Sequence, residues 1–287
     1  MNPSEPIPAP PAAKLQRLRE IIRACSSLLV AYSGGVDSAL VALIAHQELG
    51  ERSQACLGVS PSLPRREMRH AVKLAEQMGV VCRLVNTLEG DDARYAANGA
   101  DRCFFCKSEL FGRLIALARD EGWSAVADGV HAEDISDHHN GIAAARRLGV
   151  RSPLLEAGLV KQDVRDLARH LGLAAWDKPA TACLASRVPT GVAITPELLG
   201  QIDAAEDVLF DLGFTQFRVR HHGQLARVEL SAQDLSRAIE LREAIVAGVR
   251  AAGYRFVALD LEPFRSGSLA TQPARQLVTL PIRGHKQ

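Results

Sequence analysis

The feature that most constrains this chain is an alternation of short apolar runs with helical patterns through its first two thirds. The run LLVAY at 28–32 predicts a buried strand, and the apolar spacing at 14–25 and 38–49 predicts a helix on either side of it. Further strands are expected at 54–59, 80–85, 125–128 and 153–155, and further helices at 65–78, 108–119, 141–148 and 161–171. This order predicts an α/β fold: a parallel five-stranded sheet with helices on both faces, which binds ligands at the carboxyl ends of its strands.

The pattern changes after Arg187. A smaller α+β domain is expected there, with helices at 196–212 and 231–252 and strands at 215–220, 225–230 and 255–261. The turn-forming residues Pro189-Thr-Gly191 mark the boundary. We therefore expect a disordered tail at 1–13, the larger domain at 14–186, a smaller domain for substrate binding or oligomerisation at 187–270, and a flexible tail at 271–287.

Composition argues against several function classes. The chain has 34 Lys and Arg against 33 Asp and Glu, a net charge of +1, so no global charge attracts it to nucleic acid or to an anionic membrane. Its apolar stretches are far shorter than the roughly 20 residues that cross a bilayer. Six cysteines in 287 residues are too few for a disulfide scaffold. We expect a soluble, cytoplasmic protein that forms a homo-oligomer through apolar faces of its C-terminal helices.

The hexapeptide SGGVDS, from Ser33 to Ser38, follows the first strand and opens the next helix. Gly34 and Gly35 allow a tight turn and a close approach to a ligand, and a helix N-terminus directs free N–H groups at an anion. The Asp37 carboxylate suits this site if it holds Mg²⁺ or caps the helix. The loop lacks the spacing of a Walker A or dinucleotide motif, and a tight turn without a ligand is the alternative.

Three cysteines indicate a second centre. Cys103 and Cys106 precede the helix predicted at 108–119, whose N-terminus favours thiolates, and Cys183 lies far along the chain between Lys178 and Arg187. Three thiolates suit a 4Fe-4S cluster with one open iron, or zinc with an outside ligand. The CxxC pair alone is also typical of a disulfide or a zinc knuckle. Cys183 alone is compatible with a nucleophile, a sulfur donor or a buried apolar residue.

The hexapeptide resembles the PP-loop of the N-type ATP pyrophosphatases, which transfer AMP to a substrate oxygen and release pyrophosphate. Several further motifs, taken in order with it, resemble the LarE family of ATP-dependent sulfur transferases over residues 15–270. These motifs are DRCFFCKSELF at 101–111, ADGVHAEDISDHHNG at 127–141, GVRSPL at 149–154 and KPATACLASR at 178–187.

The resemblance implies a substrate, pyridinium-3,5-biscarboxylic acid mononucleotide, whose carboxylates become thiocarboxylates for the nickel-pincer nucleotide cofactor of lactate racemase. It implies ATP and Mg²⁺ as cofactors and sulfide or another compound as sulfur donor. Gly129 and Asp134 are expected near the nucleotide or metal. The residues expected to bind the ATP phosphates and Mg²⁺ are Ser33, Gly34, Gly35, Asp37 and Ser38.

Members of this family differ in their sulfur source. Some have only the cysteine that corresponds to Cys183 and sacrifice its sulfur, whereas others bind a 4Fe-4S cluster through three cysteines. This chain has all three, so the resemblance implies that Cys103, Cys106 and Cys183 are catalytic and hold a cluster that carries the transferred sulfide.

Four charged residues near the boundary and beyond it are substrate candidates. Arg218 and Arg220 share one face of a predicted strand and suit a phosphate, although solvated arginines are the simpler interpretation. Arg187 is the stronger candidate because it lies in the Cys183 segment. Glu206 on the helix at 196–212 is compatible with a substrate contact or with a solvated helix charge.

Two other functions use the same loop. A PP-loop tRNA thiolase also adenylates its substrate, but the net charge of +1 gives it little support. An amide-forming adenylating synthetase explains the loop and leaves the three cysteines without a role.

Overall fold

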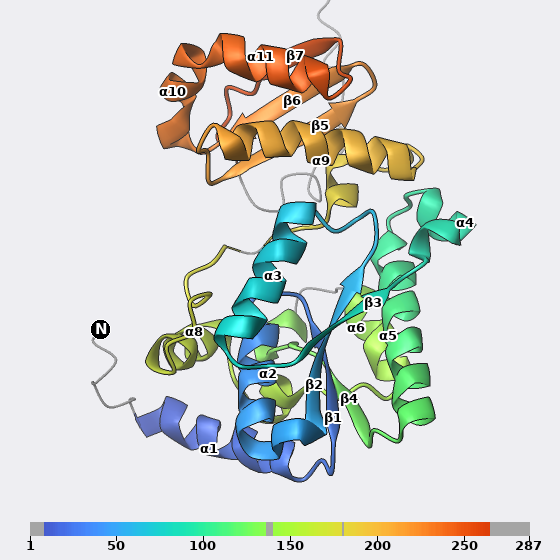
Figure 1. The fold of residues 1–287 in the computed structure, drawn as a ribbon, viewed down its shortest axis with the longest axis vertical. Coiled ribbons are helices and arrows are strands. Elements are labelled where there is room, and N and C mark those ends of the chain that lie inside the picture. The colour runs from blue at the N-terminus through green and yellow to red at the C-terminus, as the bar shows by residue number, and fades with distance from the viewer. Residues whose placement is uncertain (1–8, 136–139, 180, 265–287) are drawn as a thin grey trace, which may run out of the picture.

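The computed structural model describes residues 9–135, 140–179 and 181–264 (Figure 1). Its larger part is built on a parallel sheet with the strand order β3-β2-β1-β4, which confirms the α/β class. The strands are β1 (Leu28–Tyr32), β2 (Ser53–Val59), β3 (Cys82–Asn86) and β4 (Ala125–Ala127). Because parallel strands end at the same edge, the loops after β1 and β4 meet at one end of this sheet.

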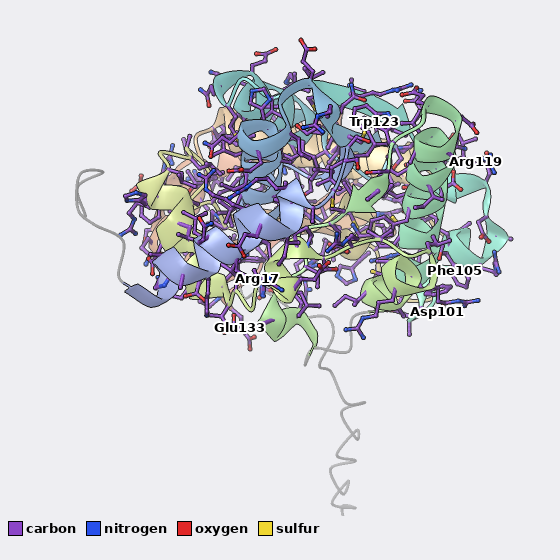
Figure 2. The ribbon with its side chains drawn as sticks, turned by 90° about the horizontal axis from the view of Figure 1, so that it is seen from below. Arg17, Asp101, Phe105, Arg119, Trp123 and Glu133 are labelled. Carbon is purple, nitrogen blue, oxygen red and sulfur yellow. The ribbon has the colours of Figure 1, made fainter. Side chains whose placement is uncertain are left out.

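Helices cover both faces of the sheet. Successive residues of β1 point to opposite sides, so each face receives apolar side chains that pack against its helices. Leu28 and Val30 pack with the helices of one face, and Leu29 packs with those of the other. The first face carries α1 (Ala9–Arg23), α2 (Val36–Leu49), α3 (Arg65–Gln77) and α8 (Lys161–His170). The second carries α5 (Arg102–Glu121) and α6 (Asn140–Arg147). Figure 2 shows Asp101 and Phe105 near the first turn of α5.

Two expectations for this part were wrong. The sheet has four strands in the described residues, because the fifth predicted strand, 153–155, is the short helix α7 (Pro153–Glu156). Proline at the first position of a helix lacks only an N–H that would be unbonded there. Arg151 instead forms a single parallel bridge with Ala127. Residues 9–13, assigned to the disordered tail, belong to α1.

The C-terminal part has a three-stranded sheet in the order β5-β6-β7. Strands β5 (Phe217–His222) and β6 (Leu225–Leu230) are antiparallel, and β7 (Phe256–Leu259) is parallel to β6. Helix α9 (Pro196–Asp211) packs on β5, and the single helix expected at 231–252 is divided into α10 (Leu235–Glu240) and α11 (Arg242–Ala251). The division lies at Leu241, whose backbone leaves the helical range while its side chain packs on the core of the small sheet.

The two parts meet where α3 approaches α9 (Figure 1). Arg66 of α3 donates to the Glu206 carboxylate of α9 at 2.6 Å, and Arg65 donates to Asp203 at 3.1 Å. Arg187, in the connection between the parts, donates to the other oxygen of Glu206 at 2.8 Å. The side chains of Arg187 and Glu206 have no exposed surface, so this ion pair is completely removed from water. None of the described helices is long and apolar enough to cross a membrane.

We predict that Glu206→Ala lowers the free energy of unfolding by about 3–5 kcal/mol, because it leaves the buried Arg187 guanidinium without its carboxylate. Glu243→Ala is the control, since Glu243 is 89% exposed and pairs with an exposed arginine. That variant is expected to stay within about 0.5 kcal/mol of the wild type. Urea unfolding measures both, and equal small effects would show that the buried pair does not hold the two parts together.

Candidate active site

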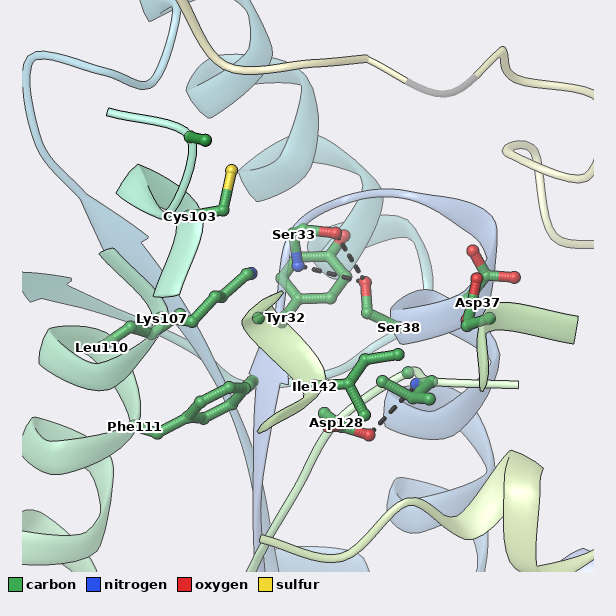
Figure 3. Close-up of a pocket in the computed structure, with 16 residues that line it drawn as sticks. Tyr32, Ser33, Asp37, Ser38, Cys103, Lys107, Leu110, Phe111, Asp128 and Ile142 are labelled. Atoms are coloured by element: carbon green, nitrogen blue, oxygen red, sulfur yellow. Dashed lines mark hydrogen bonds between the residues drawn. The ribbon is translucent and has the colours of Figure 1, made fainter. Parts of the chain in front are cut away.

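A pocket of about 630 Å³ opens at the carboxyl ends of β1 and β4. The loop after β1, the loop after β4, the first turns of α5 and the start of α6 form its wall (Figure 3). The polar and reactive side chains that line it are Ser33, Asp37, Ser38, Cys103, Lys107, Asp128 and Asp134. The site expected from the hexapeptide and the site expected from the CxxC pair therefore share one cavity.

The loop after β1 has the geometry of an anion cradle. The Ser33 amide and hydroxyl both lie 3.1 Å from the Ser38 hydroxyl, which donates to the Gly35 carbonyl at 3.2 Å. Gly35 is the N-terminal cap of α2, and because glycine has no side chain it cannot bond the free N–H groups of that helix. These groups and the positive end of the helix dipole remain available to an anion.

Two glycines bring other elements into direct contact with this loop. Gly34 has a φ of +74°, which favours glycine, and a Cβ there would lie 2.6 Å from the Ala71 Cβ on α3. Gly129 follows β4, and a Cβ there would lie 2.7 Å from the Ser38 amide nitrogen. The absence of side chains at these positions lets α3 and the β4 loop hold the cradle from two sides.

Asp37 is held by a partner that the sequence analysis missed. The Lys161 ammonium group donates to both oxygens of the Asp37 carboxylate, at 2.7 and 2.6 Å. Lys161 is the first residue of α8 and lies 124 positions along the chain. No local pattern in the sequence indicates a contact between residues so far apart. Any metal ion at Asp37 must compete with this ammonium group.

Lys107 is the second residue that the sequence analysis missed. It lies one turn of α5 beyond Cys103, and Figure 3 shows its amino group directed toward the Ser33–Ser38 loop. No carboxylate lies within ion-pair distance of Lys107 in the described part of the chain. The spacing of four residues from Cys103 was a signal only if the helix begins before Cys103, and the structure has it begin at Arg102 instead of the predicted residue 108. The charge of Lys107 is thus available to a phosphate or carboxylate in the pocket.

Asp128 and Asp134 supply acidic oxygens on the other wall. Asp128 is 5% exposed, and burial raises the pKa of its carboxyl group, an effect that the nearby Lys107 charge opposes. One Asp128 oxygen accepts from the Val130 amide at 3.1 Å, and the other has no partner among the described residues. Asp134 accepts from the His131 amide at 2.9 Å. Carboxylate oxygens of this kind are ligands that Mg²⁺ prefers.

The three cysteines belong to neighbouring elements. Cys103 is exposed at the pocket wall, whereas Cys106 and Cys183 are half-buried against one apolar cluster. Burial raises the pKa of the Cys106 thiol to about 12, and among the smaller contributions are the charges of Cys183 and Cys103. Nevertheless, no three His, Cys, Asp or Glu side chains of the described residues come together as a metal-binding group.

Arg187 holds the backbone around Cys183. Its guanidinium donates to the Ala182 carbonyl at 2.7 Å and to the Cys183 carbonyl at 3.0 Å, in addition to the Glu206 carboxylate. Although burial raises it, the pKa of the Glu206 carboxyl is lowered overall, chiefly by the charge of Arg187. Neither of these two candidate substrate residues lies on an exposed surface, so the solvated interpretation of Glu206 was wrong.

The two arginines of β5 have different surroundings. Arg220 is 5% exposed and donates to Glu229 at 3.0 Å and to the Ser186 carbonyl at 2.9 Å. Arg218 has no carboxylate within ion-pair distance among the described residues. Burial first, and then the positive charge of Arg187 and its neighbours, lowers the pKa of Arg218 to about 10. An anion bound beside Arg218 would stabilise the charged form of this guanidinium.

Arg218 lines a second pocket, of about 240 Å³, between the two parts of the chain. Its guanidinium stacks on the Phe264 ring, 4.7 Å from the centroid. Lys178, on the segment that leads to Cys183, lies in the same wall and pairs with Glu67 at 2.8 Å. The other charged or ionisable residues of this pocket are Arg66 and His70.

The chain is similar to several known proteins. The NAD synthase family model matches residues 14–99. An uncharacterized protein of Synechocystis sp. is 43% identical over 260 residues, which are 90% of this chain and 97% of that protein. The pyridinium-3,5-bisthiocarboxylic acid mononucleotide synthase of Lactiplantibacillus plantarum is 34% identical over 259 residues, 90% of this chain and 94% of that enzyme. One subunit of the glutamine-hydrolyzing GMP synthase of Pyrococcus furiosus is 29% identical over 175 residues, 56% of this chain and 54% of that subunit.

We predict that Gly129→Ala weakens the binding of ATP with Mg²⁺ by about tenfold or more. The added methyl group meets the Ser38 backbone and displaces it, and the loss of one hydrogen bond to a charged phosphate, about 1.5–3 kcal/mol, weakens binding by this factor. Gly112→Ala is the matched control, because no atom lies within 4 Å of a Cβ at that helical position. Calorimetric titration with ATP measures both variants. Equal affinities in the two would show that this loop does not bind the triphosphate.

Proposed function

Because the chain belongs to the LarE family, whose member in Lactiplantibacillus plantarum is a pyridinium-3,5-bisthiocarboxylic acid mononucleotide synthase, we propose that it is an ATP-dependent sulfur transferase. Its proposed substrate is pyridinium-3,5-biscarboxylic acid mononucleotide, in the synthesis of the nickel-pincer nucleotide cofactor. The observation that carries the proposal is that Cys103 and the Ser33–Ser38 loop line one pocket. A cysteine centre and an anion cradle are the two parts that adenylation followed by sulfur transfer requires.

In the first step, a carboxylate oxygen of the substrate attacks the α-phosphorus of ATP, and pyrophosphate leaves. The product is an acyl adenylate, which makes the former carboxylate oxygen a good leaving group. The amide and hydroxyl groups of Ser33, Gly35 and Ser38 hold the phosphates, and Lys107 offsets the charge that develops on them. Asp37 would hold Mg²⁺ together with the ATP phosphates, with Lys161 released from Asp37, and Asp134 lies in the wall of the same pocket.

In the second step, a sulfur atom attacks the carbonyl carbon of the adenylate. The new carbon–sulfur bond forms while the bond to the AMP oxygen breaks, so AMP leaves with the former carboxylate oxygen. Arg187 fixes the Cys183 carbonyl and thereby the place of this thiol. If Cys183 is the donor, its Cβ–Sγ bond then breaks with loss of the α-proton, which leaves dehydroalanine.

A 4Fe-4S cluster is the proposed sulfur source, held by Cys103, Cys106 and Cys183. Cys106 and Cys183 pack against one apolar cluster, and Arg102 contacts both the Cys103 sulfur and the turn after Cys183, which supports this assignment; the number and type of the thiols suit such a cluster. The described arrangement does not bring three ligands together, so binding requires the three cysteines to come closer to one another. When bound, the cluster would supply an iron-held sulfide, renewed from sulfide or another donor.

Arg218 is proposed to bind the phosphate of the substrate. The lowered pKa of its guanidinium and its place beside the segment that leads to Cys183 support this role. Arg220, which is already bonded to Glu229, is proposed to hold the Ser186 backbone in place. Glu206 and Arg187 are proposed to orient Cys183 and to act on the substrate through it.

An amide-forming synthetase is the second candidate. The likeness to the NAD synthase family and to the GMP synthase favours it, because both names denote synthases. That likeness covers at most about half of the chain. It gives no role to Cys103 in the pocket wall, whereas sulfur transfer uses this residue. A tRNA thiolase needs basic side chains to bind tRNA, and the overall charge of +1 gives this function no support.

The function is tested by incubating anaerobically reconstituted protein with ATP, Mg²⁺, sulfide and the pyridinium substrate, and measuring the product mass. We expect the mass change of oxygen-to-sulfur exchange, with AMP and pyrophosphate released. Cys183→Ala is expected to abolish the exchange, and Cys82→Ala, at a half-buried strand cysteine, is the control that retains it. An unchanged Cys183 after many turnovers supports the cluster, whereas its conversion to dehydroalanine supports sacrificial transfer. Exchange that survives in Cys183→Ala would contradict the proposal.

We predict that Arg218→Gln raises the KM for the pyridinium mononucleotide by about tenfold to a hundredfold, the cost of one charge-assisted contact to phosphate. The KM for ATP stays unchanged, because Arg218 lines the second pocket and not the first. Arg242→Gln removes an exposed arginine and serves as the control. A KM change for ATP alone would place Arg218 on the wrong ligand.

A further inference from the structure

The cysteine-bearing segments are far apart in sequence, and a small set of polar contacts joins them. Residues 95–106 carry the CxxC pair, and residues 183–194 carry Cys183. The Ile194 amide donates to the Ala96 carbonyl at 2.8 Å, and the Gly191 amide donates to the Asn98 carbonyl at 3.0 Å. These two backbone bonds lie well beyond Cys183. The Cys183 backbone itself is held by Arg187 and by the neighbouring Leu184 amide, which donates to the Ser62 carbonyl at 2.9 Å, but neither bond reaches the CxxC pair, so another contact must link the two cysteine-bearing segments.

Arg102 makes that contact. Its Nη1 atom donates to the Ala185 carbonyl at 2.8 Å, two residues after Cys183, and to the Asn98 side-chain oxygen at 2.8 Å. Its Nη2 atom lies 3.9 Å from the Cys103 Sγ, within hydrogen-bond range for sulfur. One guanidinium group thus spans from the first cysteine of the CxxC pair to the turn that follows Cys183.

The Asn98 side chain fixes this guanidinium group. Asn98 is 2% exposed and has a φ of +54°, a left-handed conformation that asparagine tolerates better than most residues. Its amide nitrogen donates to the Pro189 carbonyl at 2.9 Å and to the Val192 carbonyl at 3.1 Å. Its oxygen is left to accept from Arg102. All the hydrogen-bonding capacity of this side chain is directed at the junction of the two segments.

The charge of Arg102 has no carboxylate partner within ion-pair distance in the described residues. A half-buried charge usually has a carboxylate partner, whereas this guanidinium donates to a backbone carbonyl, a side-chain amide oxygen and the Cys103 sulfur. Arg102 is therefore different from the arginines that form ordinary ion pairs in this chain.

We propose that Arg102, held by Asn98, is a positioning residue that sets the separation of Cys103 from Cys183. The use of that separation in catalysis rests on the sulfur transfer proposed above, but the separation itself is a property of the protein without ligands. When Arg102 is removed, the Ala185 turn loses its link to α5, and Cys183 samples positions farther from the CxxC pair.

Thiol cross-linking tests this proposal in the full chain without ATP, metal or substrate. Cys106→Ser leaves Cys103 and Cys183 as the pair to be joined, and bifunctional thiol reagents of increasing span are applied. Peptide mass spectrometry identifies the joined residues, which separates them from the three remaining cysteines. In this background we expect Cys103 and Cys183 to be the pair joined by the shortest reagent that gives any cross-link.

Adding Arg102→Gln is expected to lower the yield with that reagent by about tenfold, the effect of losing charged hydrogen bonds of about 1.4 kcal/mol or more. Arg102→Lys keeps the charge without the forked geometry and is expected to restore part of the yield. Asn98→Gly keeps the left-handed backbone while removing the amide, and is expected to act like Arg102→Gln. Arg94→Gln is the control, because Arg94 pairs with Asp92 and stacks on Phe105.

Unchanged yields in both Arg102→Gln and Asn98→Gly would overturn the positioning role, and so would an equal loss in Arg94→Gln. Thermal unfolding shows which variants are folded, and Asn98→Gly decides the question if Arg102→Gln is not. If Arg102→Gln lowers the cross-link yield but the wild-type protein does not transfer sulfur, the proposed function is refuted and the positioning role is not. If the wild-type protein transfers sulfur but Arg102→Gln leaves the cross-link yield unchanged, the positioning role is refuted and the proposed function is not.

Discussion

The arrangement of the whole site depends on one buried carboxylate. Glu206 accepts hydrogen bonds from Arg187, from Arg66 of α3 and from the Val219 amide of β5, and its side chain has no exposed surface. Charges removed from water are tolerated only when every polar atom has a partner, so these groups have little freedom to rearrange. Arg187 in turn bonds the Cys183 carbonyl, and α3 packs through Ala71 against the phosphate loop. The carboxylate therefore links the sulfur segment to the nucleotide loop.

Local features of the site were predictable from the sequence, because they are determined within a few residues. The strand, the turn at Gly34 and the helix that follows it lie within one short segment, and the structure has them in that order. Element boundaries depend on more distant contacts. Residues 153–155 have the composition of a strand, but the proline at the start favours a helix there, and only Arg151 pairs with β4.

The roles of charged residues were harder to predict, because a sequence shows which charges exist and not which of them meet. Glu206 was considered as a solvated charge, yet it lies four residues after Ile202 and three before Leu209, both buried on α9. This spacing placed it on the apolar face of the helix and indicated burial with a partner. Lys161 pairs with Asp37 across 124 positions, and no local pattern indicates such a contact.

The central claim is that a substrate carboxylate is activated by adenylation before sulfur replaces its oxygen. The most direct test uses a substrate whose carboxylates carry a heavy oxygen isotope, in a single turnover with ATP and a sulfur source. Because the carboxylate oxygen attacks the α-phosphorus and leaves with it, we predict one heavy oxygen in AMP for each sulfur atom incorporated. Unlabelled AMP, or label found in pyrophosphate, would contradict the account.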